Sequence, residues 1–139
     1  MAKRGKKRPV GRELESLGEI LDCLQESFVI CDSADHIVFA NSRFKAMNAA
    51  VEPFTRPGTP YPRFIEAGLA DGMFPAAKGR EREWLEAALA RRRGDSGWPV
   101  EYQRRGGIWW LANRTRLPDG GTITVGVDIT ARKAAEEAL

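Results

Sequence analysis

Residues 125–139 read VGVDITARKAAEEAL, and this stretch joins two kinds of structure. Up to Asp128 the residues have the alternation and composition of a strand, whereas from Thr130 onward they are mostly helix formers. The side-chain oxygen of either Asp128 or Thr130 is suited to cap the first turn of that helix. The sequence therefore predicts a strand over 122–128 that leads directly into a helix beginning at Thr130, with little chain left to pack against it.

Two more strands are expected before this one. Residues 98–105 and 108–117 alternate or run apolar over strand length, and the intervening Gly106 and Gly107 supply a turn. A second turn is predicted at 118–121, where the sequence is PDGG. The last third of the chain is thus predicted to be an antiparallel meander of three strands.

A β-hairpin is expected nearer the start of the chain. The apolar runs 28–31 and 37–40 flank the sequence DSAD, which favours a turn. Asn41 follows the second run, where it is suited to act as the N-cap of a helix that turns Phe44 and Met47 toward the core.

The middle of the chain is predicted to be mainly helical and irregular. Residues 52–79 carry five prolines and leave room for a short helix over 64–70, and a longer helix is expected over 80–93. Together these elements predict an α+β fold, with a five-stranded antiparallel sheet and helices over one face.

A flanking helix is expected before the sheet, over residues 13–26. Its leucines are spaced three or four apart and form an apolar seam two heptads long. Two heptads are compatible both with a helix lying on its own domain and with a dimer contact. The seam consists of Leu14, Leu17, Leu21 and Leu24.

Charge is distributed unevenly along the 139 residues. Residues 1–12 hold six of the 22 basic residues and no acid, so that 16 basic and 19 acidic residues remain and give a net charge of −3. We expect residues 1–12 to be a disordered, solvated tail, although a basic tail can also contact nucleic acid or anionic lipid. No apolar run reaches the length of a membrane span and the start lacks the apolar core of a signal peptide, so we expect a cytoplasmic protein.

The residues do not predict an enzyme or a metal site. His36 is the only histidine, and its spacing from Cys23 and Cys31 is not that of zinc ligands. Phosphate-binding loops and nucleophile elbows are missing from the sequence. Cations and tryptophans do interleave on the predicted strands, as in a single-strand nucleic-acid platform, although sheet tryptophans beneath a helix are the commoner explanation. These residues are Arg104, Arg105, Trp109, Trp110, Arg114 and Arg116.

The order of elements and several short motifs together resemble a PAS domain, a bacterial sensory module. The most specific feature is Asp128-Ile129-Thr130 followed by Arg132, Lys133 and Glu136, which is similar to the exit motif that joins many PAS domains to a following helix. The hairpin-to-helix junction FAN with Phe44, and the stretches 57–61, 67–75, 84–90 and 109–121, also resemble the family.

The resemblance implies a PAS domain over residues 27–129, with a C-terminal signalling helix starting over 130–139. It implies the input module of a bacterial signalling protein, of the histidine kinase or diguanylate cyclase type, whose effector lies outside this chain. It also implies a homodimer that either senses a small ligand or serves as a ligand-free dimerisation module. Residues 41–44 read NSRF, which is similar to the NCRF sequence of light-sensing flavin PAS domains. Serine replaces the reactive cysteine, and these residues lie at the hairpin-to-helix junction rather than on the later helix, so a flavin photoadduct is not expected. Haem-binding PAS domains commonly supply a histidine from the later helix, and residues 80–93 contain none, so His-ligated haem is not expected either.

The expected site residues fall into two groups. Asn41, Asp128, Ile129 and Thr130 would fix the signal exit, where Asp128 or Thr130 is expected to cap the helix and Asp128 is also suited to pair with a nearby arginine. A ligand pocket would lie between sheet and helices if the threonines of the last strand face inward, although an interior filled by side chains is equally compatible with the pattern. The expected pocket residues are Val29, Cys31, Val38, Ala40, Phe44, Thr122, Thr124 and Gly126.

Overall fold

The computed structural model describes residues 16, 19, 20 and 25–139. The basic tail and all four leucines of the predicted seam therefore lie outside the described residues. Of the helix expected over 13–26, residues 16, 19 and 20 are helical, and residues 25–26 form a bend.

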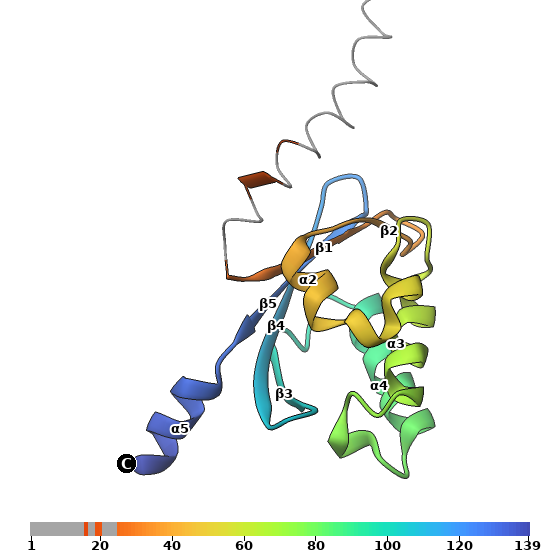
Figure 1. The fold of residues 1–139 in the computed structure, drawn as a ribbon. Helices are drawn as coiled ribbons and strands as arrows, with labels where there is room; N and C mark the ends of the chain where they lie inside the picture. Colours follow the sequence, from red (N-terminus) through yellow and green to blue (C-terminus); the bar gives the residue numbers. More distant parts are fainter. Residues whose placement is uncertain (1–15, 17–18, 21–24) are drawn as a thin grey trace, which may run out of the picture.

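A five-stranded antiparallel sheet forms one layer of the fold, as predicted (Figure 1). Its strand order is β2-β1-β5-β4-β3, so the last strand pairs with the first strand in the centre of the sheet. β5 begins and ends where the sequence predicted. The strands are β1 Ser27–Cys31, β2 Ile37–Ala40, β3 Val100–Arg104, β4 Ile108–Arg116 and β5 Thr122–Asp128.

Helices form the second layer, over one face of this sheet (Figure 1). Their apolar sides and the inner face of the sheet enclose the core, in which the rings of Phe44 and Phe64 lie 5.1 Å apart. The layer consists of α2 Ser42–Met47, η1 Ala49–Thr55, α3 Tyr61–Ala70, η2 Pro75–Ala77 and α4 Glu81–Arg93. The last helix, α5 Thr130–Ala138, extends away from the two layers. Within the described residues, none of the helices is long and apolar enough to cross a bilayer.

Asn41 ties the first strand to the first helix of this layer. Its Oδ1 accepts hydrogen bonds from the backbone N–H of Phe44, at 3.0 Å, and of Phe28, also at 3.0 Å. Its Nδ2 donates to the carbonyl oxygen of Glu26 at 3.1 Å. The predicted N-cap is therefore confirmed, and the same side chain also fixes the start of β1.

The turn between β1 and β2 is built by its acidic residues. Asp32 Oδ1 accepts hydrogen bonds from the backbone N–H of Ala34 and His36. Asp35 adopts a positive φ of 63°, which aspartate tolerates better than most residues. The predicted turn is confirmed, and Asp35 has a further role in the core.

Two boundaries differ from the sequence prediction by two residues or more, and several others differ by one. α3 begins at Tyr61 rather than at residue 64, because Pro62 is accommodated in the first turn, where no intrahelical N–H bond is required. β3 begins only at Val100, after Pro99, which has no N–H to donate to a strand ladder.

Candidate functional site

A cavity of about 300 Å³ lies between the inner face of the sheet and the helical layer. Its floor is formed where three small residues stand side by side on neighbouring strands: Ser27 pairs with Gly126, and Gly126 pairs with Ala112. Since these side chains are short, they leave room above the sheet at this point for the Trp110 ring and for the cavity beside it.

Aromatic residues form much of the cavity wall. The rings of Phe74 and Trp84 stack at 5.8 Å, and Trp84 meets Tyr102 edge-on at 6.3 Å. Trp110 lies across Gly126 so closely that a Cβ built on the glycine would be 2.4 Å from Trp110 Cζ2. The indole therefore occupies the space that the missing side chain leaves.

Buried polar side chains also line the cavity, and two of them are Thr124 and Arg104. The hydroxyl of Thr124 is buried and has no hydrogen-bond partner among the described residues. Arg104, 7% exposed, donates from Nη2 to the carbonyl oxygen of Met47 at 2.8 Å and to Asn48 Oδ1 at 3.0 Å. The guanidinium thereby anchors the C-terminal end of α2, and its centre lies 5.6 Å from the Trp110 ring.

A buried ion pair lies on another side of the cavity. Arg92, with a side chain 6% exposed, makes two hydrogen bonds to the Asp35 carboxylate, the shorter at 2.6 Å, and lies 3.7 Å from the Tyr61 ring centroid. Cys31 is next to this pair, and burial raises the pKa of its thiol to about 12 despite the opposing charge of Arg92. This thiol is therefore protonated and unreactive at neutral pH.

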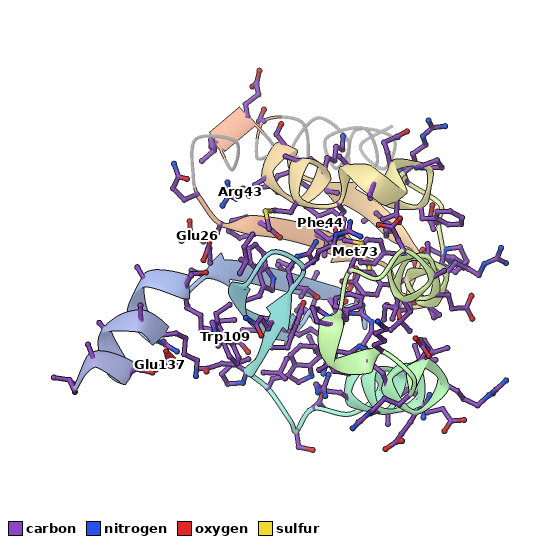
Figure 2. The ribbon with its side chains drawn as sticks, turned by 60° about the horizontal axis from the view of Figure 1, so that its bottom comes forward. Glu26, Arg43, Phe44, Met73, Trp109 and Glu137 are labelled. Atoms are coloured by element: carbon purple, nitrogen blue, oxygen red, sulfur yellow. The ribbon has the colours of Figure 1, made fainter. Side chains whose placement is uncertain are left out.

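The structure brings together half of the expected pocket residues. Val29, Phe44, Thr124 and Gly126 line the cavity, and the threonines of β5 do face inward. Figure 2 shows Phe44 and Met73 in the space between the sheet and the helices. Cys31, Ala40 and Thr122 are buried on the same side of the sheet but do not line the cavity.

Val38 was wrongly expected to face the helices. It is 38% exposed, whereas the preceding Ile37 is completely buried. The reason is a register shift between β1 and β2: Ile30 pairs with Phe39, but Cys31 pairs with Ile37, so that Val38 is the extra residue of a bulge.

The cations and tryptophans that interleave in the sequence are divided between the two faces of the sheet, which does not support the nucleic-acid alternative. Trp110 and Arg104 are buried on the inner face, whereas Arg105 is exposed and pairs with Asp71 at 2.8 Å. Trp109 lies on the outer face beside α5 (Figure 2). Strand alternation causes this division, and it leaves no continuous stacking surface.

Arg104, Trp110, Ser27 and Ala112 are cavity residues that the sequence reading did not assign to the pocket. The alternation of β4 could have placed Trp110 and Ala112 on one face, but only the register with β5 shows that Ala112 stands beside Gly126. A charged residue such as Arg104 is read as exposed by default.

The predicted signal exit begins at the end of β5, where Asp128 pairs with Trp110 of β4. Asp128 Oδ1 accepts hydrogen bonds from the backbone N–H of Thr130 at 2.9 Å and from its hydroxyl at 2.5 Å. These bonds hold the pKa of Asp128 below its usual range. Thr130 Oγ1 in turn accepts from the backbone N–H of Trp109 at 2.9 Å, and the N–H of Ile129 donates to the Trp109 carbonyl at 2.8 Å.

Asp128 thus fixes Thr130, the first residue of α5, although the N-cap residue is Ile129, which has no side-chain cap. The helix is anchored to β4 through Trp109. The expected arginine partner is not found: no ion pair joins Asp128 to another described residue, and the more distant charge of Arg43 only adds to the lowering of its pKa.

Charged residues hold the first turn of α5 against the sheet. Glu101 on β3 accepts from Arg132 at 2.6 Å and from Lys133 at 2.7 Å. The hydrogen bond from Lys133, and then that from Arg132, holds the pKa of Glu101 below its ordinary value. Lys133 Nζ also lies 4.7 Å from the Trp109 ring centroid.

The chain was compared with family models, with curated proteins and with solved structures. A family model described as PAS fold matches residues 21–137. The phage VqmA–DPO complex is similar in structure, with a TM-score of 0.52 and 15% identity; the match covers 99% of this chain and 61% of that chain, so this chain spans about three fifths of it. No curated protein sequence matches significantly.

Two isolated PAS domains also match in structure. The PAS domain of an HTR-like protein from Haloarcula marismortui has a TM-score of 0.46 and 19% identity, over 91% of this chain and 99% of that chain. The PAS domain of BvgS from Bordetella pertussis has a TM-score of 0.48 and 14% identity, over 92% and 99%.

Proposed function

The chain belongs to the PAS family, and from this premise we propose that it is a sensory and signal-relay module that binds a small ligand in the cavity and transmits through α5. One observation carries the proposal. Trp110 lines the cavity, and the adjacent Trp109 makes the backbone hydrogen bonds that anchor the start of α5. A change on the inner face of β4 therefore reaches the exit helix through a single peptide unit.

The relay needs two arrangements of the exit. A ligand that displaces the Trp110 ring alters the backbone of β4 at the point where Thr130 and Ile129 are bound. α5 then changes its angle relative to the sheet, and the ligand shifts the population between the two arrangements by its differential affinity for them.

We propose that this module works as a homodimer in the cytoplasm, as the input domain of a bacterial histidine kinase or diguanylate cyclase whose effector follows α5. The helix supports this role because its contacts with its own domain involve only its first turns. The rival role is that of a ligand-free dimerisation module. Both require association of two copies, but only the sensor requires an occupied cavity.

Native mass spectrometry of the purified chain separates these roles, because it reports bound mass and oligomeric state together. The sensor predicts a dimer that carries a small-molecule mass, or one that gains such a mass when incubated with cell extract metabolites. A dimer that never acquires a ligand mass would refute ligand sensing and favour the dimerisation module.

A further inference from the structure

The cavity contains a buried positive charge that the described part of the chain does not neutralise. We propose, on the basis of the sensory function above, that the ligand is a monocyclic aromatic carboxylate whose carboxylate binds Arg104 and whose ring lies among the aromatic side chains of the wall. The argument rests on charge, on hydrogen-bonding groups and on the size of the space.

Other deeply buried arginines have an acidic partner, and Arg104 does not. Arg92 pairs with Asp35, and Arg114 donates to Asp95 Oδ1 at 3.2 Å. Across the residues that the structure describes, no carboxylate lies within ion-pair distance of Arg104, whose two bonds to α2 go to neutral oxygen atoms. A buried, unpaired cation is costly, so an anion arriving in the cavity gains a strong interaction.

The guanidinium has donors left to bind such an anion. Arginine carries five N–H groups in a planar fork that matches a carboxylate. Nη2 is engaged by Met47 and Asn48, and the guanidinium also interacts with the Tyr102 hydroxyl, so the remaining N–H groups are the ones open to a ligand. The other charged side chains at the cavity differ from it. Glu101 is held by α5, Arg80 is exposed beside Glu83, and Arg91 is only half-buried, so water or protein already compensates each of them.

Thr124 provides a second, independent indication of a polar ligand. This residue lines the same cavity from β5 and is 8% exposed, and its buried hydroxyl has no hydrogen-bond partner among the described residues. A buried hydroxyl without a partner costs free energy until a ligand supplies one. The ligand is therefore expected to carry a second polar atom besides the carboxylate.

The wall and the volume restrict the rest of the ligand. The aromatic rings that line the cavity favour a flat, apolar body that can stack or meet them edge-on. A space of about 300 Å³ is at the small end of ligand pockets, which suits one ring with short substituents rather than a fused or dinucleotide cofactor.

The test titrates the full chain with benzoate, 4-hydroxybenzoate and phenylacetate, and with their neutral amides. Acetate serves as the carboxylate without a ring. Binding is followed by two-dimensional ¹H–¹⁵N NMR on the tryptophan indole signals, with Trp110 assigned from a Trp110→Phe variant. At least one acid is expected to shift the Trp110 signal with a Kd about 10-fold or more below those of its amide and of acetate.

Variants of two neighbouring arginines give the matched comparison. Arg104→Gln should weaken binding of that acid about 10-fold or more and change amide binding less than about 2-fold. Arg105→Gln, on the adjacent and exposed position of the same chain segment, should change neither. If Arg104→Gln does not fold, Arg104→Lys retains the charge but lacks the planar fork, and it should still lower the preference for acid over amide.

The outcomes separate this inference from the sensory function. An amide that binds as tightly as its acid, or an acid preference that survives Arg104→Gln, overturns the ligand class and leaves sensing in place. If no probe shifts the Trp110 signal, the inference is overturned. If, in addition, native mass spectrometry finds no ligand mass, the sensory function is overturned with it.

Discussion

Gly126→Ala tests whether the cavity floor and Trp110 depend on each other. The added Cβ would lie 2.4, 2.5 and 2.6 Å from three atoms of the Trp110 indole. Gly126 does not have a positive φ, so alanine causes no backbone strain, and the whole effect comes from this contact. The ring must move by about 1 Å to restore an ordinary van der Waals distance.

The size of the effect depends on where the ring can go. Inserting a methyl group into a tightly packed core costs about 1–3 kcal/mol. Here the cavity lies beside the ring, so the indole can shift into it, and we expect about 1–2 kcal/mol. For a chain of 139 residues that corresponds to a decrease in Tm of about 3–7 °C. The displaced ring also reduces the space for a ligand.

Thermal unfolding and the Trp110 indole NMR signal measure the two effects. Trp110→Phe removes the clashing atoms, so the double variant Gly126→Ala/Trp110→Phe should be more stable than the two single effects predict, with a coupling of about 1 kcal/mol. An unchanged Tm together with an unmoved indole signal in Gly126→Ala would refute the packing described for the cavity floor. Strictly additive effects would do so as well.

Three further predictions concern the exit, the buried ion pair and the thiol. Asp128→Ala removes both bonds from Thr130, so faster hydrogen exchange is expected over the first turn of α5, and unchanged exchange there would contradict its role in fixing Thr130. Asp35→Asn leaves the Arg92 charge uncompensated and should lower the free energy of unfolding by about 2–4 kcal/mol, measured by urea denaturation. The exposed-pair variant Glu52→Gln is the control and should change the free energy of unfolding much less. Burial raises the pKa of Cys31, so the contribution of its protonated thiol to stability is complete below pH 9 and is lost as the pH rises from 9.0 toward about 12. Cys31→Ala should therefore lose less stability over this range than the unsubstituted chain, by up to about 1.4 kcal/mol per pH unit. Equal slopes of the free energy of unfolding against pH in the two proteins would contradict the burial effect.

The sequence was sufficient for the parts of the fold that depend on local chemistry. β5 could be delimited at both ends because its alternation is regular and a turn precedes it. Asn41 could be identified as a cap because few residues satisfy free helical N–H groups. The inward direction of Thr124 followed from the same alternation once one face of the strand was assigned to the core.

Features that depend on pairing between strands could not be predicted in the same way. Val38 faces outward because of a bulge, and a bulge is set by the register between two strands rather than by either sequence alone. The cavity floor has the same origin, since Ser27, Gly126 and Ala112 become neighbours only through the pairing of β1, β5 and β4.

The two tryptophans of β4 also limit which ligands can act as signals. Trp109 holds α5 from the outer face, whereas Trp110 is the cavity residue next to it in the chain. A ligand that binds only near Thr124 and leaves the Trp110 ring in place has the same affinity for both arrangements of the exit, and therefore cannot change their populations however tightly it binds. Binding at Arg104, whose guanidinium lies 5.6 Å from the Trp110 ring, brings the ligand against this ring. The residue proposed to select the ligand is thus also placed where occupancy can be transmitted to α5.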